Sequence, residues 1–166
     1  MKKLLSTILI LCFCLGIYSC SKKNEADLEE STSTDTTAPT VTSVSTTADN
    51  QSLVSLTDNI TVTFSEAMDT TYVTASTSNT NCAGTIRVSS DNFRTRVKMS
   101  SDPASANSDK TFTLDPYDYL TVLTTYLTRV TTGVKNTAGN AMSSQYDNST
   151  GFTTFPSATT AIATGD

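Results

Sequence analysis

Apolar and polar residues alternate in seven short segments of this chain, all of them after residue 38. In segment 59–64 (NITVTF), every second residue is a large apolar one. A period of two places these side chains on one face, which is typical of a strand with one buried side. The other six segments are 40–45, 85–88, 94–99, 110–114, 126–130 and 152–155.

Turn-forming residues separate these segments, and no stretch keeps a helical period for three turns. The only helical candidate is a single turn over residues 66–72. About seven short strands predict an all-β fold for residues 39–155, namely an immunoglobulin-like β-sandwich. We expect the apolar residues of 59–64 to face Phe112 and Leu114 across the core.

The N-terminus has a different pattern, in which Lys2 and Lys3 precede an apolar run over residues 4–17. The sequence turns polar again from residue 21. A basic start, a short apolar core and a small residue at its end predict a secretory signal peptide over residues 1–19. The run is too short for a membrane-spanning helix, which needs about 20 apolar residues.

Cys20 follows the small residue Ser19 directly. This junction resembles the lipobox of bacterial lipoproteins, in its looser form the lipobox of spirochaetal lipoproteins, where the Cys becomes the lipidated first residue. The resemblance implies that Cys20 carries the lipid that holds the protein to a membrane. Ser21 is compatible with sorting to the outer membrane or cell surface. The alternative is an ordinary cleavage after Ser19 that leaves Cys20 as a plain thiol.

Residues 21–38 have only one apolar side chain larger than Ala, that of Leu28. Such a segment buries too little surface to offset the entropy of ordering. We therefore expect residues 20–38 to be a lipidated Cys with a disordered linker, and residues 156–166 to be a disordered tail.

Charge and cysteine content further restrict the possible partners and the possible disulfides. The chain of 166 residues has a net charge of −5. Loss of Lys2 and Lys3 makes the mature chain still more acidic, which argues against a nucleic-acid partner. Cys82 is the single cysteine of the predicted domain. We therefore expect a monomer that folds without an internal disulfide.

No residue pattern supports catalysis. The chain has no His, which excludes Ser–His–Asp and Cys–His sites and leaves no zinc ligand set. Glu66, Asp69 and Asp91 could form carboxylate pairs, but glycoside hydrolysis also needs a groove that a small sandwich rarely has. We expect no enzyme and no cofactor.

Calcium has two weak candidate sites, Glu66 with Asp69 and Asp102 with Asp109. Both are oxygen-rich, as calcium prefers. Neither has the spacing of a known calcium loop, so solvated turns are the favoured interpretation and no metal is expected.

Several stretches occur in a characteristic order: 38–41 (APTV), 59–69 (NITVTFSEAMD), 124–141 (TTYLTRVTTGVKNTAGNA) and 151–154 (GFTT). Together they resemble the SbsA-type bacterial Ig-like domain, found in S-layer and other surface proteins. The resemblance covers nearly all of residues 38–155. It implies a sandwich used for display, spacing or adhesion, with no shared catalytic site.

The FSEAMD residues have structural interpretations. Met68 is expected to close one end of the core. Ser65 and Asp69 are expected to bond neighbouring backbone groups, as short polar side chains do in turns.

Residues nearer the C-terminus are also expected to have structural roles. Tyr126 is expected to form a tyrosine corner, and Asn136, Gly139 and Asn140 to tolerate left-handed backbone conformations.

The lipoprotein relatives imply one more feature. A Cys near position 82 often pairs with a Cys on the following strand, where this chain has Arg96. The resemblance therefore implies a free thiol at Cys82, and the alternative is a small buried side chain.

Two functions remain open. The first is a lipoprotein displaying its domain at the cell surface for binding or adhesion, with an unidentified protein or matrix ligand. The second is a structural spacer or assembly component of the envelope with no ligand of its own.

Overall fold

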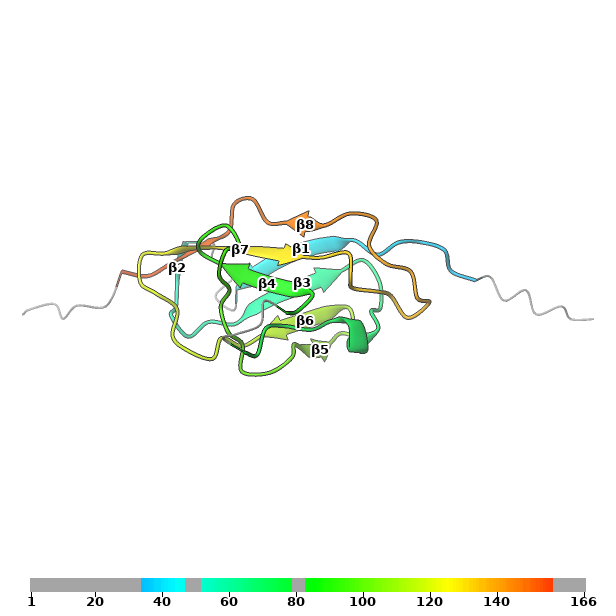
Figure 1. Ribbon diagram of the computed structural model, residues 1–166, viewed down its shortest axis with the longest axis horizontal. Coiled ribbons are helices and arrows are strands. Elements are labelled where there is room, and N and C mark those ends of the chain that lie inside the picture. Colours follow the sequence, from blue (N-terminus) through cyan, green and yellow to red (C-terminus); the bar gives the residue numbers. More distant parts are fainter. Residues whose placement is uncertain (1–33, 47–51, 79–82, 157–166) are drawn as a thin grey trace, which may run out of the picture. The chain divides into compact units, whose positions relative to one another are not determined.

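The computed structural model describes residues 34–46, 52–78 and 83–156, and these form a sandwich of two β-sheets (Figure 1). The predicted signal peptide, Cys20 and Cys82 lie outside the described residues. The elements are β1 (Val41–Thr46), β2 (Ser52–Val54), β3 (Ile60–Phe64), a 3-10 turn η1 (Thr70–Tyr72), β4 (Ile86–Ser89), β5 (Ala104–Ala106), β6 (Thr111–Leu114), β7 (Thr125–Val130), β8 (Tyr146–Asp147) and β9 (Phe152–Thr154).

The first sheet has the strand order β1-β3-β6-β5 and is antiparallel throughout. The second sheet has the order β2-β9-β7-β4, and the short β8 also pairs with β7. Within it, β2 and β9 run parallel. The all-β sandwich predicted from the sequence is confirmed, with nine strands in the described residues rather than about seven.

Six of the seven alternating segments form strands, and one prediction is wrong. Segment 94–99 is irregular, apart from a bridge between Met99 and Pro116. Its backbone touches β4 through one bond, from Val97 N to Val88 O (2.9 Å). The strands β2, β5 and β8 were missed because two or three residues are too few to show a period. The single turn expected within 66–72 is η1.

The core lies between the two sheets and contains three fully buried Phe side chains, Phe64, Phe112 and Phe152. Phe64 and Phe112 meet edge to face, with ring centroids 5.7 Å apart. The expectation that segments 59–64 and 110–114 face each other across the core is wrong. They are β3 and β6, neighbours in one sheet, with Val62 opposite Phe112. Alternation identifies the buried face of a strand but not the sheet to which the strand belongs.

The tyrosine corner is confirmed. The Tyr126 hydroxyl accepts a hydrogen bond from the backbone N–H of Thr121 (2.9 Å), five residues upstream. Its ring stacks on Phe152 with centroids 5.5 Å apart. This contact ties the loop before β7 to the core.

The FSEAMD turn has the structural roles expected of it. Met68 is buried, and its N–H donates to the Asp109 carbonyl (2.9 Å). The Ser65 hydroxyl accepts from Thr40 N–H (3.0 Å). The Asp69 carboxylate accepts from Thr71 N–H (2.9 Å) and so caps η1.

The expectation that Asn136, Gly139 and Asn140 all take left-handed backbone conformations is wrong. Only Gly139 has a positive φ (+90°), while Asn136 and Asn140 do not. Asn136 is instead a buried hydrogen-bonding centre. Its Nδ2 donates to Glu66 Oε2 (2.7 Å) and its Oδ1 accepts from Asn140 N–H (2.7 Å). A buried amide must satisfy its donors and acceptors, which the distant Glu66 and the nearby Asn140 do here.

Candidate functional site: an arginine face on the second sheet

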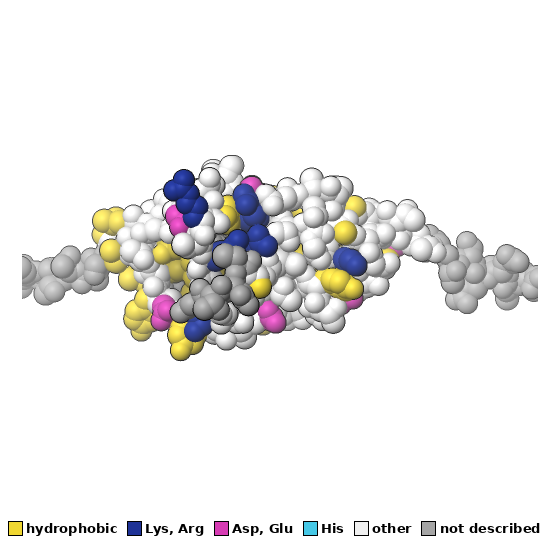
Figure 2. Space-filling model, in the orientation of Figure 1, with side chains coloured by type: hydrophobic (Ala, Val, Ile, Leu, Met, Phe, Trp, Pro, Cys, Tyr) yellow, Lys and Arg dark blue, Asp and Glu magenta, His cyan; other side chains and the backbone are white. Residues whose placement is uncertain are grey.

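All four arginines of the chain lie between positions 87 and 129, and they gather around β4 and β7. Arg87 on β4 and Arg129 on β7 stand directly opposite each other in the sheet register. Their strand neighbours Val88 and Val130 point into the core, so both arginines point outward. Figure 2 shows Lys and Arg side chains gathered over this sheet. We call Arg87, Arg94, Arg96 and Arg129 the arginine face.

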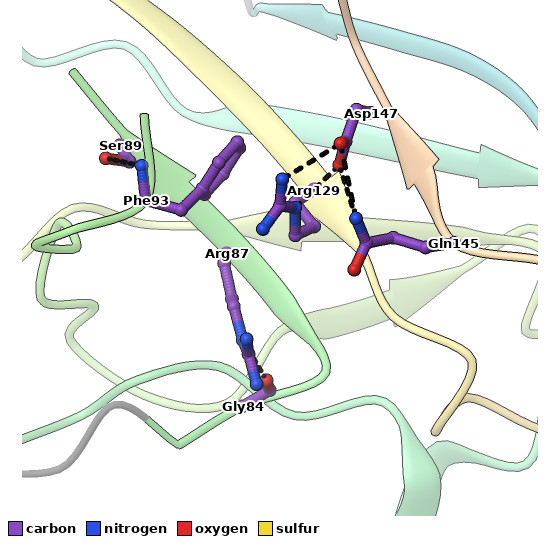
Figure 3. A network of polar contacts seen from close by, with 7 residues as sticks. All are labelled: Gly84, Arg87, Ser89, Phe93, Arg129, Gln145 and Asp147. Carbon is purple, nitrogen blue, oxygen red and sulfur yellow. Dashed lines mark hydrogen bonds and ion pairs between the residues drawn. The ribbon is translucent and has the colours of Figure 1, made fainter. Parts of the chain in front are cut away.

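Arg129 contacts Asp147 and Phe93 (Figure 3). Its Nε and Nη2 donate to the two carboxylate oxygens of Asp147 on β8, at 2.7 and 2.9 Å. The Gln145 amide donates to the same carboxylate (3.2 and 3.3 Å). The Phe93 ring lies 4.0 Å from the guanidinium carbon. The hydrogen bond from Arg129 lowers the pKa of Asp147, because it stabilises the ionised carboxylate.

The loop after β4 is organised by the Asp91 carboxylate. It accepts hydrogen bonds from the N–H and hydroxyl of Thr95 (2.9 and 2.7 Å) and from the Ser89 hydroxyl (2.7 Å). These bonds, first those of Thr95, lower the pKa of Asp91 to about 2. Asn92 and Phe93 both have positive φ (59° and 63°), which is uncommon outside glycine. The loop thereby turns Phe93 onto Arg129.

Arg94 and Arg96 follow in the irregular segment that lies beside β4. The bond from Val97 to Val88 fixes this position. Arg94 is exposed to solvent. Arg96 is half-buried, and its Nε and Nη1 are buried with no hydrogen-bond acceptor.

Arg87 points away from Arg129, toward the start of β4 (Figure 3). Its Nε donates to the Gly84 carbonyl (2.9 Å). Gly84 has a φ of +98°, and a Cβ there would lie 2.7 Å from the Ala75 backbone. Only glycine fits this position, so the backbone acceptor that orients Arg87 depends on Gly84.

The calcium candidates named from the sequence have other partners. Glu66 accepts from Asn136, Asp69 caps η1, and Asp102 Oδ1 accepts from Ala75 N–H (3.0 Å). Asp109 lies in a turn with a φ of +59°. Over residues 34–46, 52–78 and 83–156, no group of three or more His, Cys, Asp and Glu side chains could hold a metal ion.

The sequence patterns did not predict the arginine face. One signal was present. Every arginine falls in one stretch of an acidic chain, and Arg87 and Arg129 occupy the outward positions of alternating segments. That these positions are opposite each other depends on strand pairing.

Residues 35–154 match the model of the bacterial Ig-like domain family. The chain belongs to this family. Bacterial Ig-like domains are not a family of enzymes. The family resemblance read from the FSEAMD and TTGVKNTAGNA stretches is therefore confirmed at the level of the bacterial Ig-like domain.

The Ig-like domain is also similar to solved structures of the surface layer protein SbsC. Against domains 1–6 of SbsC the identity is 23%, the TM-score 0.48, and the match covers 68% of this chain and 13% of that chain. Against the N-terminal part of SbsC the identity is 22%, the TM-score 0.48, and the coverage 72% and 24%. The chain thus spans under a quarter of these S-layer proteins. No curated protein matches it.

Among the residues with a described structure, no helix is long and apolar enough to cross a membrane.

Proposed function

We propose that this protein is a non-enzymatic cell-envelope lipoprotein that displays its single Ig-like domain at the cell surface to bind a ligand. In this proposal, lipid on Cys20 holds the protein to the outer membrane. Residues 21–38 connect the lipid to the domain. The family and the S-layer similarity support a cell-surface location.

The observation that carries a binding role is the arginine face. In a chain with a net charge of −5, Arg87 and Arg129 lie on the outer side of one sheet, and Arg94 and Arg96 lie in the segment beside that sheet. Surface charges on a domain with no ligand are usually mixed in sign, because like charges repel. A face with an excess of positive charge in an acidic protein instead favours a ligand of negative charge.

A structural spacer is the second candidate function, and the positions at which the chain enters and leaves the domain favour it. The segment before β1 and the segment after β9 leave the domain at opposite ends (Figure 1). A module with its ends far apart suits a separating role as well as a binding one.

The proposed lipid anchor on Cys20 is tested on protein extracted from membranes. Mass spectrometry should find a diacyl or triacyl adduct on an N-terminal Cys20. The Cys20→Ala variant should appear in the soluble fraction, and protease treatment of intact cells should remove the wild-type domain. A mature protein that begins elsewhere and is released in soluble form would contradict the anchor.

The binding part is tested by comparing cells that carry the protein with cells that lack the gene. Saturable binding of matrix material only by the first supports a binding role. Defective envelope assembly on deletion, with no change in binding, supports the spacer.

A further inference from the structure

We propose that the arginine face binds an acidic polysaccharide through the sulfate or carboxylate groups of the sugar chain. The inference rests on the proposed binding function and names the ligand class of that surface.

The face has an unequal number of positive and negative groups. Among the described residues, the four arginines lie with two carboxylates, those of Asp91 and Asp147. Asp147 neutralises Arg129, and Asp91 accepts its described hydrogen bonds from Ser89 and Thr95 within its own loop. The face therefore keeps an excess of positive charge on an acidic protein, which restricts a polyanion to this one side.

Arg96 is the costly residue of the face. Buried N–H donors without an acceptor are destabilising, and the Nε and Nη1 of Arg96 are two nitrogens of this kind. An anion beside Arg96 lowers this cost, because it brings negative charge next to the guanidinium group.

The chemistry of the arginine face indicates the class of its ligand. Guanidinium groups match the two oxygens of a carboxylate or sulfate through paired hydrogen bonds. Among the described residues, no large hydrophobic side chain is exposed on β4, on β7 or on residues 89–97. A protein partner needs an apolar interface centre.

A nucleic acid is disfavoured by the same surface. Single strands bind through aromatic rings on which bases stack. Phe93 is the aromatic residue at the arginine face, and its side chain is buried beneath Arg129. An acidic polysaccharide needs no such platform.

The test uses the mature full chain with four probes: heparin, hyaluronate, neutral dextran and a single-stranded DNA oligomer. We expect binding to heparin or hyaluronate that weakens from about 0.05 M to about 0.5 M NaCl, and no binding to dextran. Arg94→Glu should weaken this binding about tenfold, since it reverses one exposed charge on the face. Lys110→Glu, on the exposed hairpin of the other sheet, is the matched control and should have little effect.

Three results would overturn the inference. They are equal loss in Arg94→Glu and Lys110→Glu, stronger binding to DNA than to either polysaccharide, and no binding to heparin or hyaluronate. In the last case, matrix binding by whole cells would still support the proposed function with another ligand. Circular dichroism of both variants establishes that each remains folded.

Discussion

The guanidinium of Arg129 binds the carboxylate of Asp147 through two hydrogen bonds, 2.7 Å from Nε to Oδ1 and 2.9 Å from Nη2 to Oδ2. The two residues are opposite each other on the paired strands β7 and β8. This pair neutralises one of the two facing arginines, so Asp147 sets both the stability and the net charge of the arginine face.

Asp147→Asn should lower the free energy of unfolding and raise the affinity for heparin. The loss of stability should be below about 1 kcal/mol, the usual range for a pair that is partly exposed to solvent. The affinity should rise because the face loses one of its two carboxylates. Urea unfolding and heparin binding at equal salt measure the two effects. Asp118→Asn, at an exposed site, is the control, and equal affinities in the two variants would contradict the prediction.

Asp91 should make the domain sensitive to acid. Its pKa is about 2 in the folded protein, below the value near 3.9 of an unfolded chain. A lowered folded pKa means that its contribution to stability is complete above about pH 4 and is lost as the pH falls toward about 2. Urea unfolding between these pH values should show a shallower fall in stability for Asp91→Asn than for wild type. An unchanged slope would mean that the hydrogen bonds from Thr95 do not persist in solution.

Tyr126→Phe should cost about 1 kcal/mol of stability, the usual net value of one hydrogen bond. The variant leaves the Thr121 N–H without the hydroxyl acceptor but keeps the ring stacked on Phe152. Thermal unfolding measures the change. Tyr119→Phe is the matched control, because Tyr119 is 79% exposed and its hydroxyl can be replaced in contact with water. Equal melting temperatures for the two variants would contradict the tyrosine corner.

Phe64→Ala should cost about 3–5 kcal/mol, because it removes a buried ring from the contact with Phe112. Asp69→Ala should cost less and keep the fold, since it loses only hydrogen bonds to Thr71 in a turn that is exposed to solvent. Denaturant unfolding of both variants provides the comparison. If Asp69→Ala were equally damaging and calcium protected only the wild type, the FSEAMD turn would be a metal site.

The alternating segments show where sequence reasoning succeeds and where it fails. In β3 and β6 the period of two identified the buried side chains, because the alternation of a strand is a local property. Segment 94–99 has a similar alternation but forms no strand. The turn before it is set by the bonds from Ser89 and Thr95 to Asp91, and no pattern of apolar residues records these bonds.

For the arginine face, too, some features follow from the sequence and others only from the tertiary structure. The sequence by itself determined that Arg87 and Arg129 lie on the outer side of their strands, and that Tyr126 and the FSEAMD turn belong to an Ig-like sandwich. Only the tertiary structure decided that β4 pairs with β7, which brings the two arginines opposite each other, and that the buried Asn136 bonds Glu66. Strand order and buried long-range hydrogen bonds depend on segments that are distant in the chain, and they leave no periodic trace in either segment alone.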